Sequence, residues 1–192
     1  MGGFGGSPST GGAGGGGDPF ATCHQRGPTE GCYITEDNIL GPYYKPGAPF
    51  DGNIADDLPG DLMLIQGVVY GCDCETPLAG AIVDVWQADS EGAYDNAGFT
   101  LRGKIETDEN GRYSFVTIKP GWYLNGATYR PAHIHYKVSH ADGLALTTQL
   151  YFEGDPYIDG DPYVKESLII PLANGNVGRQ AGLVGTFDIV LG

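Results

Sequence analysis

Basic residues are scarce in this chain of 192 residues. It has 10 lysines and arginines against 24 aspartates and glutamates, which gives a formal net charge of −14. Nucleic acids and anionic membrane surfaces repel so acidic a protein. No apolar run approaches the roughly 18 residues that a membrane-spanning helix needs. We therefore expect no nucleic-acid partner and no membrane insertion, and we take the acidity as a contribution to solubility.

Helical periodicity is also missing, because no segment longer than ten residues repeats its apolar residues at helical spacing. The sequence has instead a series of short β-like runs, separated by turns rich in Gly, Pro and Asp. They lie at residues 62–71, 79–89, 111–118, 133–140, 146–154, 167–173 and 185–192. Such a series predicts an all-β fold, an antiparallel β-sandwich or a barrel. We favour the sandwich, with long connecting loops.

The sequence shows no intact signal peptide, since no charged segment precedes an apolar one at its start. Residues 1–20 are instead rich in Gly and Ser, which is typical of a flexible linker or disordered tail. We expect residues 21–192 to form a single domain. A glycine-rich stretch ahead of a cysteine-bearing domain suits an extracellular or periplasmic protein whose export signal has been removed. An ordinary cytoplasmic leader is the alternative.

The four cysteines all lie in the first half of the chain, at Cys23, Cys32, Cys72 and Cys74. An even number in loop-like surroundings favours disulfides and an oxidising compartment. We expect two bridges that link residues 23–32 to the 72–74 turn, with the connectivity left open. A four-thiolate zinc site is the alternative, but neither pair has the two-residue spacing that such sites favour.

The chemically richest stretch is YLNGATYRPAHIH, residues 123–135, which ends on a β-like run. His133 and His135 are separated by one residue, so on a strand both side chains project from the same face. Two neutral imidazoles on one face can bind one metal ion. Two histidines that merely form hydrogen bonds in a core are the alternative.

Four motifs occur in order along the chain: ETPLAGAIVDVWQADSEGAYDN (75–96), LRGKIETDENGRYSFVTIKPGWY (101–123), RPAHIHYKV (130–138) and TTQLYFEGDPY (148–157). Together they resemble the intradiol ring-cleavage dioxygenases, the family of catechol 1,2-dioxygenases and protocatechuate 3,4-dioxygenases. The resemblance runs from about Ile39 to Asp161, with a weaker match in the closing strand. It implies that residues 21–192 are a catalytic domain.

The resemblance also implies a metal. The family binds one non-haem Fe(III) through two tyrosinates and two histidines, which match Tyr94, Tyr123, His133 and His135 of this chain. Phenolate is a hard anionic ligand that stabilises ferric iron, and a bound metal ion makes it easier for a tyrosine to lose its proton. Each tyrosine alone carries little weight among the 12 in the chain. Their coincidence with the His-x-His motif is what favours the site.

The reaction implied by the resemblance opens catechol or a substituted catechol with O₂, between the two hydroxyl-bearing carbons, and gives a cis,cis-muconate. Tyr123 corresponds to the family tyrosinate that takes up a substrate proton. Arg130 corresponds to an arginine beside the metal that stabilises negative charge on the ring, although a structural salt bridge would also explain it. Gln149 matches a glutamine close to the substrate.

Two departures from the family pattern bear on the substrate. Only nine residues lie between Tyr123 and His133, where catechol 1,2-dioxygenases carry a longer insertion. The sequence also has no counterpart of the N-terminal helical domain through which those enzymes dimerise. Both differences suggest a shorter, more open pocket and leave the substrate range open, and the oligomeric state stays open as well. Tyr43 and Tyr44 match the position of the family's substrate-facing loop. We expect at least one of them to border the substrate ring.

Two other classes of protein share parts of the pattern. Small β-sandwich modules that resemble transthyretin-like and carboxypeptidase-regulatory domains carry similar strand motifs, bind carbohydrate or protein, and hold no metal. They have no need of the four-residue ligand set or of Arg130. A copper or zinc site on a sandwich is the second alternative, but tyrosinates are unusual zinc ligands.

Overall fold

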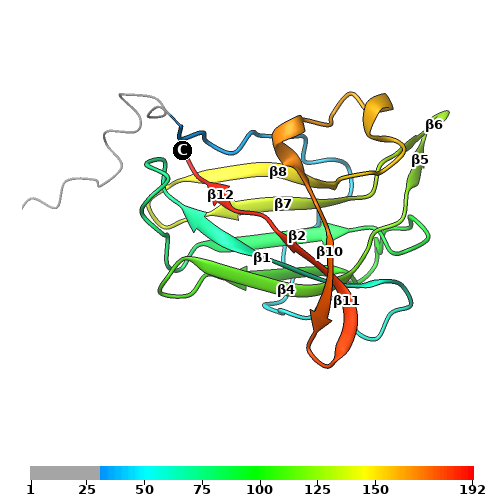
Figure 1. The fold of residues 1–192 in the computed structure, drawn as a ribbon, viewed down its shortest axis with the longest axis horizontal. Coiled ribbons are helices and arrows are strands. Elements are labelled where there is room, and N and C mark those ends of the chain that lie inside the picture. The colour runs from blue at the N-terminus through cyan, green and yellow to red at the C-terminus, as the bar shows by residue number, and fades with distance from the viewer. Residues whose placement is uncertain (1–30) are drawn as a thin grey trace, which may run out of the picture.

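The computed structural model describes residues 31–192, which form a protein built almost entirely of strands (Figure 1). The strands are β1 (Leu62–Tyr70), β2 (Ile82–Gln87), β3 (Arg102–Glu106), β4 (Arg112–Ile118), β5 (Tyr123–Asn125), β6 (Thr128–Arg130), β7 (His133–Ser139), β8 (Ala145–Phe152), β9 (Ile169–Ile170), β10 (Ala173–Val177), β11 (Gln180–Thr186) and β12 (Ile189–Val190). Two short 3₁₀ helices, η1 (Ile158–Gly160) and η2 (Glu166–Leu168), separate β8 from β9. No helix among these residues has the length and apolar character needed to cross a membrane.

The strands form two sheets and a separate hairpin, so the predicted all-β sandwich is confirmed. In the first sheet β1 pairs with β4 on one side and with β11 and β12 on the other, and β10 extends β11. The second sheet has the order β3-β2-β7-β8-β9. Most pairs are antiparallel, but β11 and β12 run parallel to β1, and β9 runs parallel to β8. The predicted tail falls in residues 1–20, outside the described part of the chain.

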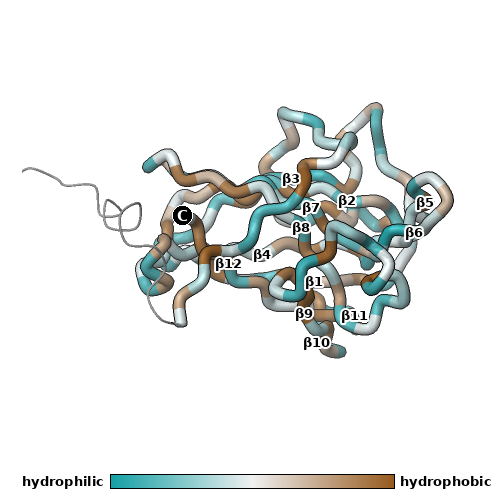
Figure 2. Tube along the Cα trace, turned by 90° about the horizontal axis from the view of Figure 1, so that it is seen from above, coloured by the Kyte–Doolittle hydropathy of each residue, from teal (hydrophilic) through white to brown (hydrophobic). Residues whose placement is uncertain are grey.

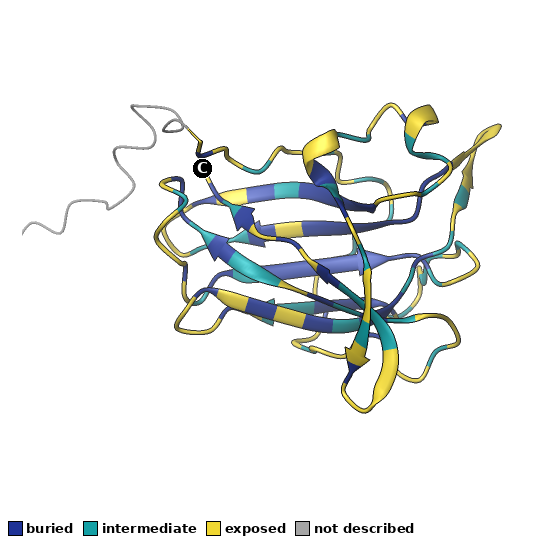
Figure 3. Ribbon diagram, in the orientation of Figure 1, coloured by how far each residue is buried: buried dark blue, intermediate teal, exposed yellow. Residues whose placement is uncertain are grey.

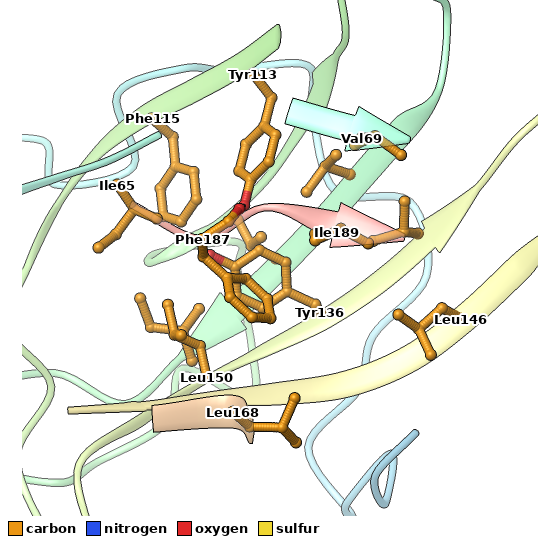
Figure 4. Close-up of a cluster of buried hydrophobic side chains, with 14 of the residues drawn as sticks. Ile65, Val69, Tyr113, Phe115, Tyr136, Leu146, Leu150, Leu168, Phe187 and Ile189 are labelled. Atoms are coloured by element: carbon orange, nitrogen blue, oxygen red, sulfur yellow. The ribbon is translucent and has the colours of Figure 1, made fainter. Parts of the chain in front are cut away.

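The main hydrophobic core lies between the two sheets (Figure 4). Alternate residues of each strand point into it, for example Ile65 of β1 and Ile134 and Tyr136 of β7, all of them fully buried. Hydrophobic and hydrophilic residues interleave along the strands, as the hydropathy colouring shows (Figure 2). Burial of the apolar side chains that point inward is the main force that holds the two sheets together.

A close backbone approach shapes the edge where β11 gives way to β12. The amide of Phe187 donates to the carbonyl of Gln66 at 2.9 Å, and its carbonyl accepts the Tyr113 hydroxyl at 2.6 Å. A Cβ atom on Gly67 would lie only 2.0 Å from that carbonyl oxygen. Glycine is therefore required at position 67 for the closing strand to reach β1.

The second sheet is buried on both faces where β7 begins, although Lys137, further along the same outer face, is exposed (Figure 3). Trp86, His135 and Gln149 alternate with the core residues of β2, β7 and β8, yet each is at most 1% exposed. Irregular segments cover this face: Asn38 bonds to Gln149, and residues 43–45 contact the 94–102 region. Long loops thus create a second buried layer, which carries the polar residues.

The β5–β6 hairpin projects at the end of the sandwich opposite the C-terminus (Figure 1). Its pairing places Tyr123 opposite Arg130, and β7 begins three residues later at His133. The nine residues between Tyr123 and His133 are therefore mostly this hairpin. At the same end β2 stops at Gln87, and an irregular loop leads to β3.

Some strands were not predicted from the sequence. β3 was missed, as was the β10–β11 hairpin, whose strands include three glycines and two asparagines (ANGNV and QAGLVGT). Glycine and asparagine are both depleted in strands, so these two segments carry little strand signal. The predicted closing strand at 185–192 is in fact the end of β11 together with β12.

A disulfide joins Cys32 to Cys74, 42 residues apart. Cys72 is also disulfide-bonded, and among residues 31–192 there is no free cysteine. Cys23 lies outside the described residues. The bridge from residues 23–32 to the 72–74 turn is confirmed for Cys32, and it removes the alternative of a four-thiolate zinc site.

Breaking this bridge should destabilise the fold, because it closes a long loop in the unfolded chain. We expect Cys32→Ala to lower the free energy of unfolding by about 2–4 kcal/mol, measured by urea denaturation. The double variant Cys32→Ala/Cys74→Ala is the matched control. Its free energy of unfolding should be at most about 1 kcal/mol lower than that of the single variant, since both variants lose the same bond. Equal stability of wild type and Cys32→Ala would contradict the linkage.

Candidate active site

Two tyrosines and two histidines converge at the hairpin end of the second sheet. His133 and His135 project from one face of β7, with ring centroids 4.9 Å apart. Tyr94 comes from the loop after β2, and its hydroxyl lies 3.4 Å from His133 Nε2. Tyr123, the first residue of β5, has its ring centroid 5.7 Å from that of His133 and 5.8 Å from that of Tyr94. The structure thus brings all four predicted ligand residues together.

The backbone fixes the tautomer of His133. Its Nδ1 lies 2.6 Å from the carbonyl oxygen of Pro131, so we assign the proton to Nδ1 as the donor. Nε2 then carries the free lone pair and points toward the Tyr94 hydroxyl. A metal-binding imidazole commonly donates its other N–H to a backbone carbonyl, which orients the ring.

The His135 ring is held between an aromatic ring and the backbone. It stacks on Trp86, with centroids 4.9 Å apart and planes inclined by 3°. Gly41 covers it with a φ of +71°, and a Cβ there would lie 3.0 Å from His135 Cε1. His135 Nδ1 is buried and makes no hydrogen bond to the described residues. The Ile39 backbone opposes the lowering of the His135 pKa, but burial outweighs it.

Burial keeps the two histidines and Tyr94 neutral. It lowers the pKa of His133 to about 4, with help from the positive charge of Arg130. Burial also lowers the pKa of His135 well below its ordinary value, and the neighbouring His133 and Arg130 add to this shift. The pKa of Tyr94 is raised, by burial first and then by Tyr123. Both imidazoles are thus available as metal ligands at neutral pH, and the Tyr94 phenol needs a nearby cation to ionise.

Arg130 lies behind the histidines in a network of buried partners. Its Nε donates to Asp161 Oδ2 at 2.5 Å, and its Nη2 donates to Gln149 Oε1 at 3.0 Å and to the Tyr151 hydroxyl at 3.1 Å. Its Nη1 lies 3.4 Å from His133 Nε2. Burial lowers the pKa of Arg130, but the hydrogen bonds to Asp161 and Tyr123 outweigh this and raise it overall. A fixed positive charge therefore faces the four-residue cluster.

Gln149 uses both ends of its amide inside the protein. Oε1 accepts from Arg130 and Tyr151, while Nε2 donates to the carbonyl of Ile39 at 2.9 Å and to Asn38 Oδ1 at 3.2 Å. It is fully buried. The side chain thus ties Arg130 to the segment that covers His135.

Tyr43 and Tyr44 occupy different surroundings. Tyr43 stacks on Tyr94 with ring centroids 4.2 Å apart, and its edge-on contact with Tyr123 is at 5.9 Å. The Tyr44 hydroxyl instead donates to Asp84 at 3.2 Å, and its ring packs on Trp86. Of the two residues predicted at the substrate, Tyr43 lies against Tyr94 and Tyr123, and Tyr44 lies beside Asp84.

The donor set fits a hard, high-valent metal ion. Within residues 31–192 no group of three or more His, Cys, Asp or Glu side chains could hold a metal, so a set of four protein ligands in this cluster would have to include the tyrosines. Two phenols with two imidazoles suit ferric iron better than zinc. A hollow of about 650 Å³ on the described surface is lined by residues such as Gln66 and Arg112, outside this cluster. The chemistry, rather than the size of a hollow, identifies the site.

Sequence reasoning missed Asp161, Tyr151, Trp86 and Arg102. Asp161 lies at the end of a turn-rich stretch, and nothing in its neighbours marks it as the partner of Arg130. Arg102 opens β3 and is only 3% exposed. One feature of the sequence could have indicated Arg102. Basic residues are few in this acidic chain, and Arg102 lies inside a family motif.

Comparison with known sequences now defines the class. The sequence model of the family described as Dioxygenase matches residues 39–192. The hydroxyquinol 1,2-dioxygenase of Rhizobium sp. (strain MTP-10005) is 38% identical over 79% of this chain and 59% of its own length. The chlorocatechol 1,2-dioxygenase of Rhodococcus opacus is 34% identical over 82% of this chain and 72% of its own. The chain thus spans about three fifths of the first relative.

Solved structures agree with this result. The dioxygenase domain of a dioxygenase–carbohydrate-binding fusion from Streptomyces sp. SirexAA-E has a TM-score of 0.72 and 38% identity, over 83% of this chain and 98% of that one. The 3-chlorocatechol 1,2-dioxygenase of Rhodococcus opacus 1CP has a TM-score of 0.76 and 32% identity, over 84% and 74%. The family model and these relatives together define the class of protein. This chain belongs to the intradiol ring-cleavage dioxygenase family.

Removal of the Asp161 carboxylate would leave Arg130 buried without its counter-charge. Breaking a buried ion pair on one side is strongly destabilising, so Asp161→Ala should lower the free energy of unfolding by about 3 kcal/mol in urea denaturation. Asp159→Ala, an exposed acid two residues earlier in η1, is the matched control and should change stability by less than about 0.5 kcal/mol. Equal effects of the two substitutions would show that the Arg130–Asp161 ion pair contributes nothing to the free energy of unfolding.

Proposed function

We propose that this protein binds one Fe(III) through Tyr94, Tyr123, His133 and His135, and that it opens catechol or a simply substituted catechol with O₂ to a cis,cis-muconate. The observation that carries this proposal is the convergence of two phenols and two neutral imidazoles at one end of a buried sheet face. Membership of the intradiol family supports it. The zinc, copper and metal-free binding-module alternatives leave that combination unexplained.

The iron would supply the Lewis acidity that promotes loss of the catechol protons and activates the ring toward O₂. The chain itself supplies the ligands and the dry surroundings. The Pro131 carbonyl holds the His133 ring with Nε2 toward the cluster. Trp86 and Gly41 hold the His135 ring from its face and its edge. Ligands fixed in this way need little reorganisation when a metal binds.

Tyr123 is the group that we assign to hold a substrate proton. It lies on a short hairpin strand rather than in the main sheet, and it is only partly buried, so its ring has more freedom than the histidines. The Arg130 guanidinium lies 5.9 Å from the centre of its ring.

Arg130 is the group that we assign to stabilise negative charge on the substrate ring. Its network with Asp161, Gln149 and Tyr151 keeps the guanidinium in one place, so the charge is already oriented when the reaction begins. Gln149 acts through Arg130 as a positioning residue, because both ends of its amide are already bonded within the protein. Its predicted role at the substrate thus becomes an indirect one.

Tyr43 is the residue that we assign to border the substrate ring. It stacks on Tyr94 and meets Tyr123 edge-on, so a catechol in this cluster would lie beside it. Tyr44 bonds to Asp84 and packs on Trp86, so we assign it to the support of that wall.

We also propose an extracellular or periplasmic location, on the strength of the Cys32–Cys74 bridge. Disulfides persist in oxidising compartments and are rare in the cytosol. Thiol titration of protein purified without reductant tests the proposal. Absence of reactive thiols supports it, and four free thiols per chain would overturn it.

Loss of a ligand should remove the iron and the colour. Ferric iron bound by tyrosinate absorbs visible light, so we expect a red-brown wild type. Tyr94→Phe and His135→Ala should each retain well under half of the wild-type iron, measured by metal analysis together with the visible spectrum. Tyr33→Phe is the matched control, because Tyr33 is 77% exposed, and it should keep full iron. Full iron and unchanged colour in both ligand variants would refute the assignment.

Loss of the buried charge should slow the reaction more than it weakens binding. In an oxygen-electrode assay with catechol, Arg130→Ala should lower kcat by about 100-fold, as removal of one preorganised electrostatic group does elsewhere. Its affinity for catechol, measured by the colour shift, should change less than about tenfold. The exposed Arg179→Ala, with the same loss of charge, should match wild type. Iron-loaded wild type that yields no muconate would leave a catechol-binding protein.

A further inference from the structure

Tyr94 lies on an irregular loop, and no sheet register fixes its position. His133 and His135 are held by pairing of β7 with both β2 and β8. Tyr94 instead lies between the end of β2 at Gln87 and the start of β3 at Arg102. A side chain on such a segment needs another device to hold it within hydrogen-bonding range of a histidine.

The loop is closed from within by one carboxylate. Asp95 Oδ1 accepts the amides of Ala97 and Gly98 at 2.9 and 2.7 Å, and Oδ2 accepts the amide of Thr100 at 3.0 Å. A Cβ on Gly98 would lie 2.7 Å from Asp95 Oδ2, so the turn leaves no room for a larger residue. The loop is thus a compact unit, and its attachment to the rest of the protein decides where Tyr94 lies.

That attachment is the guanidinium of Arg102. Its Nε and Nη2 donate to the carbonyl of Asp95 at 3.1 and 2.9 Å, next to Tyr94. Its Nη1 donates to the carbonyl of Tyr43 at 2.7 Å. One buried side chain thus joins the backbones of the two segments whose rings, Tyr43 and Tyr94, stack at 4.2 Å.

A second link connects the same two segments nearer the surface, where Lys45 Nζ also donates to the carbonyl of Ala97 at 2.5 Å. Lys45 Nζ donates to the carbonyl of Gly98 at 3.0 Å, and it lies 4.6 Å from the centre of the Phe99 ring. The Arg102 link differs in being buried and in using three N–H groups of a rigid planar fork. Lysine cannot reproduce that geometry, because its ammonium is a single point of contact.

We propose that Arg102 is a positioning residue of the site. It fixes the Tyr94 loop and the Tyr43 segment to the end of β3, and thereby sets the placement of the Tyr94 phenol relative to His133 and of the Tyr43 ring relative to both. Its consequence for iron rests on the proposed metal role of Tyr94. The positioning itself does not, so it can be tested on iron-free protein.

The test is hydrogen–deuterium exchange of iron-free protein. In Arg102→Gln the amides of residues 97–100 and 43–45 should exchange at least about tenfold faster than in wild type, while those of β7 keep their protection. Arg102→Lys, which keeps the charge and loses the fork, should accelerate the same segments by at least about threefold. It also serves as the second variant if Arg102→Gln does not fold.

Lys104→Gln is the matched control for charge. Lys104 lies two residues further along β3 and makes no hydrogen bond through its side chain to the described residues. This variant should exchange like wild type in both segments. Wild-type exchange in Arg102→Lys, or equal acceleration of the loop and of β7 in the arginine variants, would overturn the proposal.

A second readout addresses the metal. In iron-loaded protein, Arg102→Lys should shift or weaken the visible absorption per bound iron, whereas a residue with only a structural role would lower the melting temperature and leave that absorption unchanged. Wild-type protein that takes up no iron would defeat the proposed function. The exchange comparison would still decide the role of Arg102.

Discussion

The alternation of side chains along β7 is the constraint on which the rest of the structure depends. Ile134 and Tyr136 point into the core between the sheets, so His133 and His135 must point to the outer face of the same sheet. In a simple sandwich that face would meet water. Here the covering loops bury it, and both imidazoles are at most 2% exposed. The strand sets the direction of the two imidazoles, and the loops make their surroundings dry.

The charged side chains near the tyrosine–histidine cluster are mainly positive, whereas the molecule as a whole is negative. The chain is strongly acidic, yet the cations Arg130 and Arg102 lie close to the tyrosine–histidine cluster, and the acid beside Arg130, Asp161, is paired with it. These charges disfavour protonated histidine and favour phenolate at Tyr94. Such surroundings favour anionic oxygen ligands and an anionic substrate, and they suit a ferric site in which a catechol loses its protons.

Features that depend on local pattern could be predicted from the sequence. Alternating apolar residues marked most strands of the two sheets, and the one-residue spacing of His133 and His135 placed them on one face. The β10–β11 hairpin could not be seen, because its Gly- and Asn-rich strands have little strand propensity and are held by pairing with β1. Tyr94, Tyr123 and Arg130 were assigned by family resemblance, since no periodicity relates residues on separate loops.

Long-range contacts of single side chains could not be predicted from the sequence. The bond from Arg102 to the carbonyl of Tyr43 spans 59 positions, and the ion pair of Arg130 with Asp161 spans 31. Such contacts depend on how loops lie over a sheet, and the hydrophobic pattern of the sheet does not encode this. The separate surroundings of Tyr43 and Tyr44 show the same limit, because adjacent residues of one motif reach different partners.

The most direct measurement is an anomalous difference map at the iron absorption edge, from crystals of the iron-loaded protein. The account predicts one strong peak within bonding distance of the hydroxyl oxygens of Tyr94 and Tyr123 and of Nε2 of His133 and His135. Tyr94→Phe crystals prepared in the same way should show a weaker peak or none. A map with iron bound elsewhere, or with no peak between these four side chains, would contradict the central claim.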